Sequence, residues 1–155
     1  MIKIALGYKE VNGPWGGGNR FIRSLKDTLT ENNFVCRSNL KDKDIAIILL
    51  TDPRFRSPLV NFSIAEIIFY KVFINQKVII VHRVNECDER KNTNFMNYLL
   101  INANWCADFT VFVGSWLIDL NCWKKNIRTP YKTILNGADK NVFNSIGYKK
   151  WNDAK

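Results

Sequence analysis

The chain has 155 residues and a mass of 18.0 kDa, which suits one domain and is too short for two of ordinary size. Hydrophobic residues make up 46% and charged residues 24%, a composition typical of globular proteins and not of disordered or fibrous ones. The 23 Lys and Arg residues outnumber the 14 Asp and Glu residues, and the net charge of +9 favours an anionic partner such as phosphate, nucleic acid or an acidic membrane surface.

Apolar runs rich in β-branched residues predict strands, and amphipathic segments between them predict helices. In chain order, the predicted elements are strand Ile2–Leu6, helix Arg20–Leu29, a weak strand Phe34–Cys36, strand Ile45–Leu50, a helix over 63–73, strand Val78–Val81, helix Thr93–Cys106, strand Thr110–Val113, short helix Ser115–Leu120 and strand Thr133–Leu135. Ser63, with Glu66 three residues later, has the pattern of a capping box.

This alternation of strands and helices predicts a Rossmann-like, three-layer α/β/α fold with a mainly parallel sheet. The crossover connections are expected to be right-handed. In such sheets, ligands bind beyond the carboxyl ends of the strands. We therefore expect the functional residues directly after Leu6, Leu50, Val81, Val113 and Leu135.

The cysteines and the single histidine restrict the kinds of site that the chain can hold. Cys36, Cys87, Cys106 and Cys122 include no CxxC pair, which excludes a zinc ribbon and indicates free thiols in a reducing compartment. One His excludes a multi-His metal site, and we expect no metal and no cofactor. The most apolar stretch, 64–81, is interrupted by charged residues, so we expect a cytoplasmic protein that can touch a membrane only peripherally.

A glycine-rich loop follows the first predicted strand and leads into the first helix. Gly16, Gly17, Gly18 and Asn19 stand at the helix start, where free N–H groups can hold an anion. The spacing matches neither the dinucleotide fingerprint GxGxxG nor a P-loop. The alternative is a plain flexible connection.

Polar residues also follow the third and fourth predicted strands. Asp52 and Arg54 come after the third strand and are candidates for substrate binding, although Asp52 can equally cap the turn that Pro53 imposes. The segment 82–91 follows the fourth strand and supplies candidate catalytic residues and phosphate-binding cations, namely His82, Glu86 and Asp88 for catalysis and Arg83 and Arg90 for phosphate. The alternatives are a solvated loop of local ion pairs and a structural histidine.

A further motif, Ile134-Leu-Asn-Gly-Ala-Asp-Lys-Asn-Val-Phe143, follows the last predicted strand. Together with the glycine loop, the His82 strand end and Ser115, it resembles GT-B glycosyltransferases of family 4, in which the pattern NGxDxxxF closes the N-terminal domain. Asn136, Gly137, Asp139 and Phe143 match that pattern with the family's spacing.

The resemblance implies a transferase with two Rossmann-like domains that face a cleft. The N-terminal domain would hold a glycan or lipid-linked acceptor, and the second domain a nucleotide-sugar donor, with retaining, metal-independent transfer. It also implies that the glycine loop and Ser115 approach the donor, that His82 lies near the transferred sugar, and that Asn136, Gly137 and Asp139 line the hinge.

The family's second domain would begin about where this sequence ends, twelve residues after Phe143. We therefore expect residues 1–143 to form an N-terminal, acceptor-side domain and 144–155 to be an interdomain linker or a cut end. Such a chain would be inactive without its second domain or a partner chain.

Two alternatives remain open. A stand-alone basic module could bind phosphate, although nucleic acid is disfavoured because the basic residues form no block and the aromatic residues lie in apolar runs. A non-catalytic subunit could use Trp116, Trp123 and Trp151 as an interface, positions that suit a core or hinge equally well.

Overall fold

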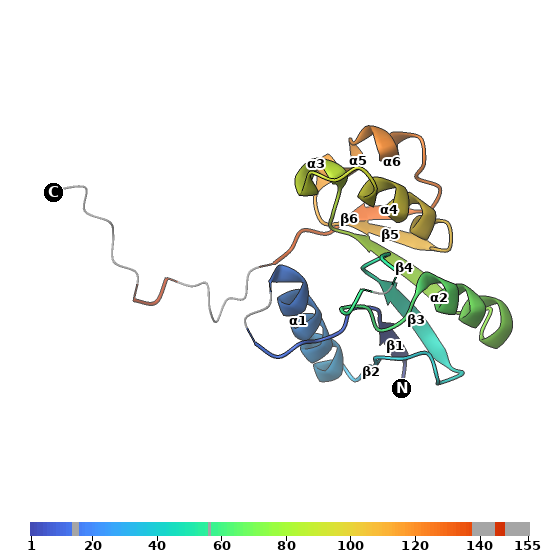
Figure 1. Cartoon of the computed structure of the whole chain (residues 1–155). Helices are drawn as coiled ribbons and strands as arrows, with labels where there is room; N and C mark the ends of the chain where they lie inside the picture. Colours follow the sequence, from blue (N-terminus) through green and yellow to red (C-terminus); the bar gives the residue numbers. More distant parts are fainter. Residues whose placement is uncertain (14–15, 56, 138–144, 148–155) are drawn as a thin grey trace.

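The computed structural model describes residues 1–13, 16–55, 57–137 and 145–147. These residues build a six-stranded sheet in the order β2-β1-β3-β4-β5-β6, in which every neighbouring pair is parallel (Figure 1). The strands are β1 (Lys3–Leu6), β2 (Val35–Arg37), β3 (Ile45–Leu50), β4 (Ile79–Val84), β5 (Phe109–Phe112) and β6 (Tyr131–Thr133). The predicted parallel α/β sheet is therefore confirmed.

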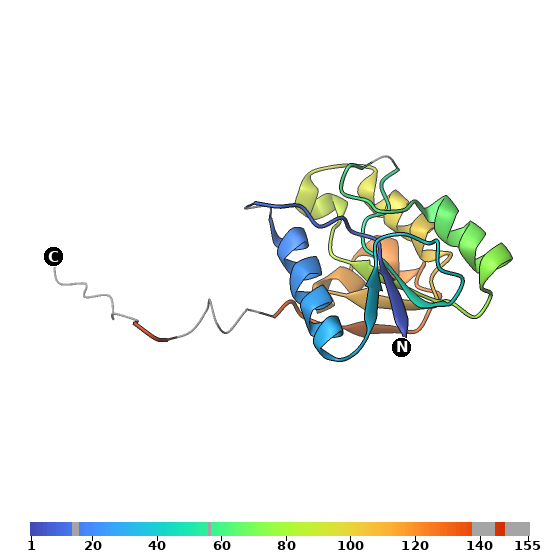
Figure 2. The same ribbon diagram turned by 90° about the horizontal axis from the view of Figure 1, so that it is seen from below.

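Helices cover both faces of this sheet. They are α1 (Gly17–Glu31), α2 (Ile64–Phe69), the π-helical turn η1 (Tyr70–Ile74), α3 (Asp88–Lys91), α4 (Met96–Asn104), α5 (Ser115–Ile118) and α6 (Asn121–Lys124). Figure 2 shows α1 on one side of the strands and α2 on the other. The three-layer, Rossmann-like arrangement expected from the sequence is present.

The central strand β3 shows why its sequence is a continuous apolar run. Ile48 and Leu50 pack in the cluster that contains Ile67 of α2, whereas Ile47 and Leu49 pack against the cluster of α1. Both faces of β3 are thus covered by helices, so alternation with polar residues is absent.

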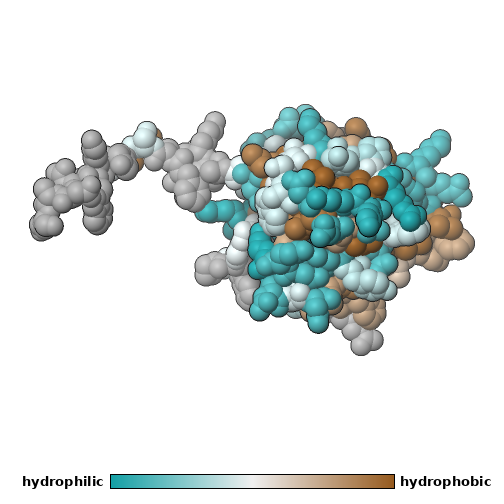
Figure 3. Space-filling model, turned by 90° about the horizontal axis from the view of Figure 1, so that it is seen from above, coloured by the Kyte–Doolittle hydropathy of each residue, from teal (hydrophilic) through white to brown (hydrophobic). Residues whose placement is uncertain are grey.

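The second helix begins with the predicted capping box. Ser63 Oγ accepts the Glu66 N–H at 3.3 Å, and the Glu66 carboxylate accepts the Ser63 N–H at 2.7 Å. The helix then continues into the π-helical turn, where the buried Tyr70 hydroxyl donates to the Asp42 carbonyl at 2.6 Å and accepts the Ile45 N–H at 3.1 Å. Its outer face is apolar, and Figure 3 shows hydrophobic side chains at the right-hand edge, where Figure 1 places α2 and η1.

Four details of the predicted elements were wrong, and one of them is that the short helix α3 was not predicted. Strand β4 extends to Val84, so His82 and Arg83 lie inside it and not beyond its end. The last strand is Tyr131–Thr133, two residues earlier than predicted, and the short helix α6 was not predicted at all.

Two predictions about composition can be compared with the structure. All four cysteines are free, as predicted. Within the described ranges, no helix is long and apolar enough to cross a membrane.

Candidate functional site

The candidate site lies at the carboxyl edge of the sheet, where the strand order reverses between β1 and β3. This switch point is where open parallel sheets bind ligands. The loop after β1 is held in place there by Asn61, whose Nδ2 donates to the Leu6 carbonyl at 2.8 Å and to the Tyr8 carbonyl at 3.0 Å. Tyr8 and the residues after β3 consequently meet at this edge.

Asp52 and Arg54 form a fork-shaped ion pair directly after β3. Arg54 Nε lies 2.9 Å from Asp52 Oδ1, and Arg54 Nη2 lies 2.6 Å from Oδ2. Asp52 Oδ1 also accepts the Arg54 backbone N–H at 3.0 Å, which is the turn-capping bond considered from the sequence. The Asp52 carboxylate is buried by these contacts, whereas half of the Arg54 side chain is exposed and can meet a ligand.

Helix α1 begins at Gly17 with Gly16 as its N-cap, at the same edge. A Cβ on Gly16 or Gly17 would meet nothing, but a Cβ on Gly18 would lie 3.2 Å from the Tyr8 ring. Gly18 therefore lets Tyr8 rest on the first turn of the helix. Burial, with a smaller effect from the Asp52 charge, raises the pKa of this phenol, so it remains a neutral hydrogen-bond donor.

Asn19 holds the glycine loop against the helix. Its Oδ1 accepts the Val11 N–H at 2.9 Å and its Nδ2 donates to the Val11 carbonyl at 2.7 Å. The side chain is buried, so in this structure its amide serves the loop, and the predicted contact with a ligand is left to the glycines.

Arg83 is a buried cation on the α1 face of β4. Its guanidinium carbon lies 3.7 Å from the centre of the Phe21 ring of α1, and its Nη2 donates to Asn136 Oδ1 at 2.8 Å. Burial lowers the pKa of Arg83 to about 10, and the charge of Glu86 opposes that shift. A guanidinium has five N–H donors, and among the described residues this is the one hydrogen bond that the Arg83 side chain makes, so further donors can meet an anion.

Glu86 lies on the loop that follows β4. Its Oε2 is buried and, within the described residues, accepts no hydrogen bond, while Lys91 Nζ and Arg90 Nη2 lie 3.4 and 3.9 Å away. The local ion pairs considered from the sequence are therefore present. The carboxylate nevertheless keeps one oxygen that accepts no hydrogen bond from the described residues.

His82 lies on the opposite face of β4 and has no exposed surface. Its Nδ1 is 3.1 Å from Asn104 Nδ2 of α4, and its ring centre is 6.5 Å from that of Trp123. Burial lowers its pKa to about 3. In this structure His82 matches the structural histidine of the alternative interpretation, because its ring is fully buried against Asn104 of α4 and Trp123 of α6.

Asp88 caps helix α4. Its Oδ1 accepts from the Thr93 hydroxyl and the Met96 N–H, and its Oδ2 accepts the Asn97 N–H at 3.0 Å. Burial raises the pKa of this carboxyl, but these hydrogen bonds outweigh it and the net shift is downward. The predicted catalytic carboxylate is thus engaged in helix capping.

The remaining predicted residues are placed as follows. Ser115 is exposed as the first residue of α5, and Gly137 is exposed after β6 with open space around it. Asp139, Phe143 and Trp151 lie outside the described residues. Trp123, one of the residues considered for an interface, is fully buried. No three His, Cys, Asp or Glu side chains of the described part gather as metal ligands.

The structure thus brings Arg83, Asn136 and Phe21 of α1 together. Tyr8, Arg54 and Glu86 lie close enough to one another for their charges to interact. Sequence reasoning missed Tyr8 and Phe21. Tyr8 could have been predicted, because it stands two residues after the end of the first strand, where ligand-binding residues were expected. No protein-family model matches the chain, and no curated protein is significantly similar to it.

Proposed function

We propose that the chain is the acceptor-side domain of a GT-B glycosyltransferase similar to family 4, which transfers a sugar from a nucleotide-sugar donor to an acceptor hydroxyl. The observation that carries the proposal is the hydrogen bond between Arg83 and Asn136. It joins the first residue of the NGxDxxxF pattern to the carboxyl edge, next to the glycine-opened start of α1.

The residues divide the work of such a reaction by their chemistry. The first N–H groups of α1 have no acceptor within the helix, and with the Arg83 guanidinium they would hold the donor diphosphate. The Glu86 carboxylate would accept the hydrogen of the attacking hydroxyl. Transfer would retain the anomeric configuration and need no metal.

Anion binding at Arg83 is tested with Asn136→Asp. Asn136 is exposed, so the fold should persist, but the new carboxylate would pair with Arg83 and repel a phosphate. We expect the affinity for pyrophosphate and for UDP, followed by calorimetry, to fall about tenfold. The matched control is Asn102→Asp, the same charge change at the exposed end of α4 away from this edge.

Equal affinities of wild type and Asn136→Asp would refute anion binding at Arg83. The transfer reaction has its own measurement, which is release of UDP from a nucleotide sugar by the complete protein, with its second domain or partner. Glu86→Gln should reduce this rate sharply. Pyrophosphate binding without any sugar transfer would leave the basic binding module as the function.

A further inference from the structure

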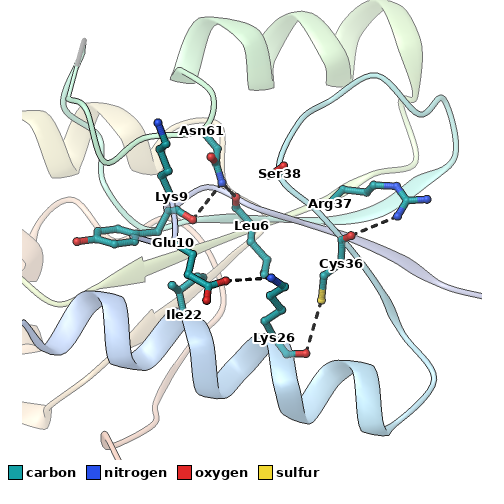
Figure 4. A pocket seen from close by; sticks show the side chains of 10 residues that line it. Leu6, Lys9, Glu10, Ile22, Lys26, Cys36, Arg37, Ser38 and Asn61 are labelled. Atoms are coloured by element: carbon teal, nitrogen blue, oxygen red, sulfur yellow. Dashed lines mark hydrogen bonds and ion pairs between the residues drawn. The ribbon is translucent and has the colours of Figure 1, made fainter. Parts of the chain in front are cut away.

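A hollow lies at the carboxyl ends of β1 and β2, on the far side of β1 from Arg83. It has a volume of about 420 Å³, within the range of small-molecule sites. Figure 4 shows its side chains, which come from the end of β1 and the loop after it, from α1, from the end of β2 and, for Asn61, from the loop before α2. Its lining includes Lys9, Glu10, Lys26, Cys36, Arg37 and Ser38.

The floor of the hollow is apolar and its rim is charged. Leu6 and Ile22, both almost fully buried, lie at the bottom beside Tyr8. Three cations line it against one carboxylate; one of them, Arg37, is already paired with Asp42 at 2.9 Å, whereas Lys9 has no ion-pair partner among the described residues. The lining of the hollow therefore carries a net positive charge, which favours binding of an anion.

The one carboxylate occupies the place that an anion would take. Glu10 Oε2 lies 2.9 Å from Lys26 Nζ and Oε1 lies 3.1 Å from Arg23 Nε, so the pair ties the loop after β1 to α1. In Figure 4, Glu10 and Lys26 point toward one another along one side of the hollow. A bound anion would compete with Glu10 for the Lys26 ammonium.

We propose that this hollow binds a small polyhydroxylated anion of the size of a sugar phosphate. Lys9 and Lys26 would contact the anionic group. The Ser38 hydroxyl and the Asn61 Oδ1 would take hydroxyls, since the Asn61 Nδ2 is already used by the Leu6 and Tyr8 carbonyls. The inference rests on the hollow itself and is independent of the proposed transfer reaction.

The test is a titration of the labelled chain with glucose 6-phosphate, inorganic phosphate and glucose, followed by amide chemical shifts in NMR. Glucose 6-phosphate should shift amides of residues 6–10, 22–26 and 36–38 more strongly than phosphate does, and glucose should not. Glu10→Gln should tighten binding about three- to tenfold because it frees Lys26. Lys26→Gln should weaken binding by a similar factor. Lys77→Gln, an exposed cation before β4, is the control.

Each other result counts against the hollow. Absence of shifts up to about 10 mM, or shifts that neither variant changes, would overturn the proposal. Shifts confined to the surroundings of Arg83 and Asn136 would overturn it and leave the proposed function intact. Conversely, if Asn136→Asp leaves pyrophosphate binding unchanged while the hollow still responds to its variants, only the Arg83 site fails.

Discussion

Protonation of His82 should destabilise the fold in mild acid. The ring has no exposed surface, and when the Asn104 amide donates to Nδ1, the ring proton lies on Nε2. That nitrogen has no hydrogen-bond partner within the described residues. Burial without a carboxylate partner penalises the imidazolium, so the folded pKa of about 3 lies below the value of 6.5 for an unhindered imidazole.

The sign and size follow from these two pKa values. Below pH 6.5 the unfolded chain binds a proton that the folded chain refuses, so stability is lost as the pH falls from 6.5 towards 3. At a pH of about 5, protonation of this one group stabilises the unfolded state relative to the folded state by roughly 2 kcal/mol. The figure follows from about 1.36 kcal/mol for each pH unit below the unfolded pKa. Acidic groups titrate mainly at lower pH and do so in any His82 variant as well.

Urea unfolding of wild type and His82→Gln at pH values of about 7.5 and 5, followed by tryptophan fluorescence, isolates the effect. The wild type should lose about 2 kcal/mol more than the variant between the two conditions. If the variant does not fold, the single His of the wild type still gives an assignable imidazole resonance, which should not titrate between these values. Equal losses of stability in both proteins, or a resonance that titrates near pH 6.5, would refute the reasoning.

Two further predictions concern packing and capping. Trp123→Ala should lower the free energy of unfolding by about 3–5 kcal/mol, because it empties a fully buried site beside Phe112. The control is Trp105→Ala, whose ring is mostly exposed under Arg128 and whose loss should lower it by about 1 kcal/mol or less. Similar urea midpoints for the two variants would contradict this prediction. Ser63→Ala should lower the free energy of unfolding by about 1 kcal/mol, because the capping box is lost. The control, Ser24→Ala at an exposed position within α1, should not lower the urea midpoint. An unchanged midpoint for Ser63→Ala would contradict the stabilising role of the capping box.

The sheet could be predicted from the sequence because most of its strands are short apolar runs rich in β-branched residues. Strand β3 is apolar at every position, and the structure has it at the predicted bounds. The prediction ended strand β4 at Val81 because the next two residues, His82 and Arg83, are polar. In the structure, His82 contacts Asn104 of α4 and Arg83 stacks on Phe21 of α1, so both are accommodated inside the strand. No local rule reveals that a distant helix will satisfy a polar residue inside a strand.

The sequence predicted the edge of the sheet where candidate residues gather better than it predicted which side chains face that edge. The sequence predicted functional residues after the strand ends, and the structure does place Asp52 and Arg54 directly after β3. Asp88 fits the same rule, but its carboxylate faces the start of α4, eight residues away in sequence, and not the cleft. Asp88 caps α4 and Glu86 does not, and this difference depends on the geometry of the loop after β4, which sequence spacing alone does not define.

The sheet narrows toward both sides. Strands β2 and β6 have three residues each, whereas β3 and β4 in the middle have six. An incoming strand would therefore find only a few main-chain groups to pair with at either border. Long exposed borders are templates for edge-to-edge association, so this taper limits lateral growth of the sheet into larger assemblies.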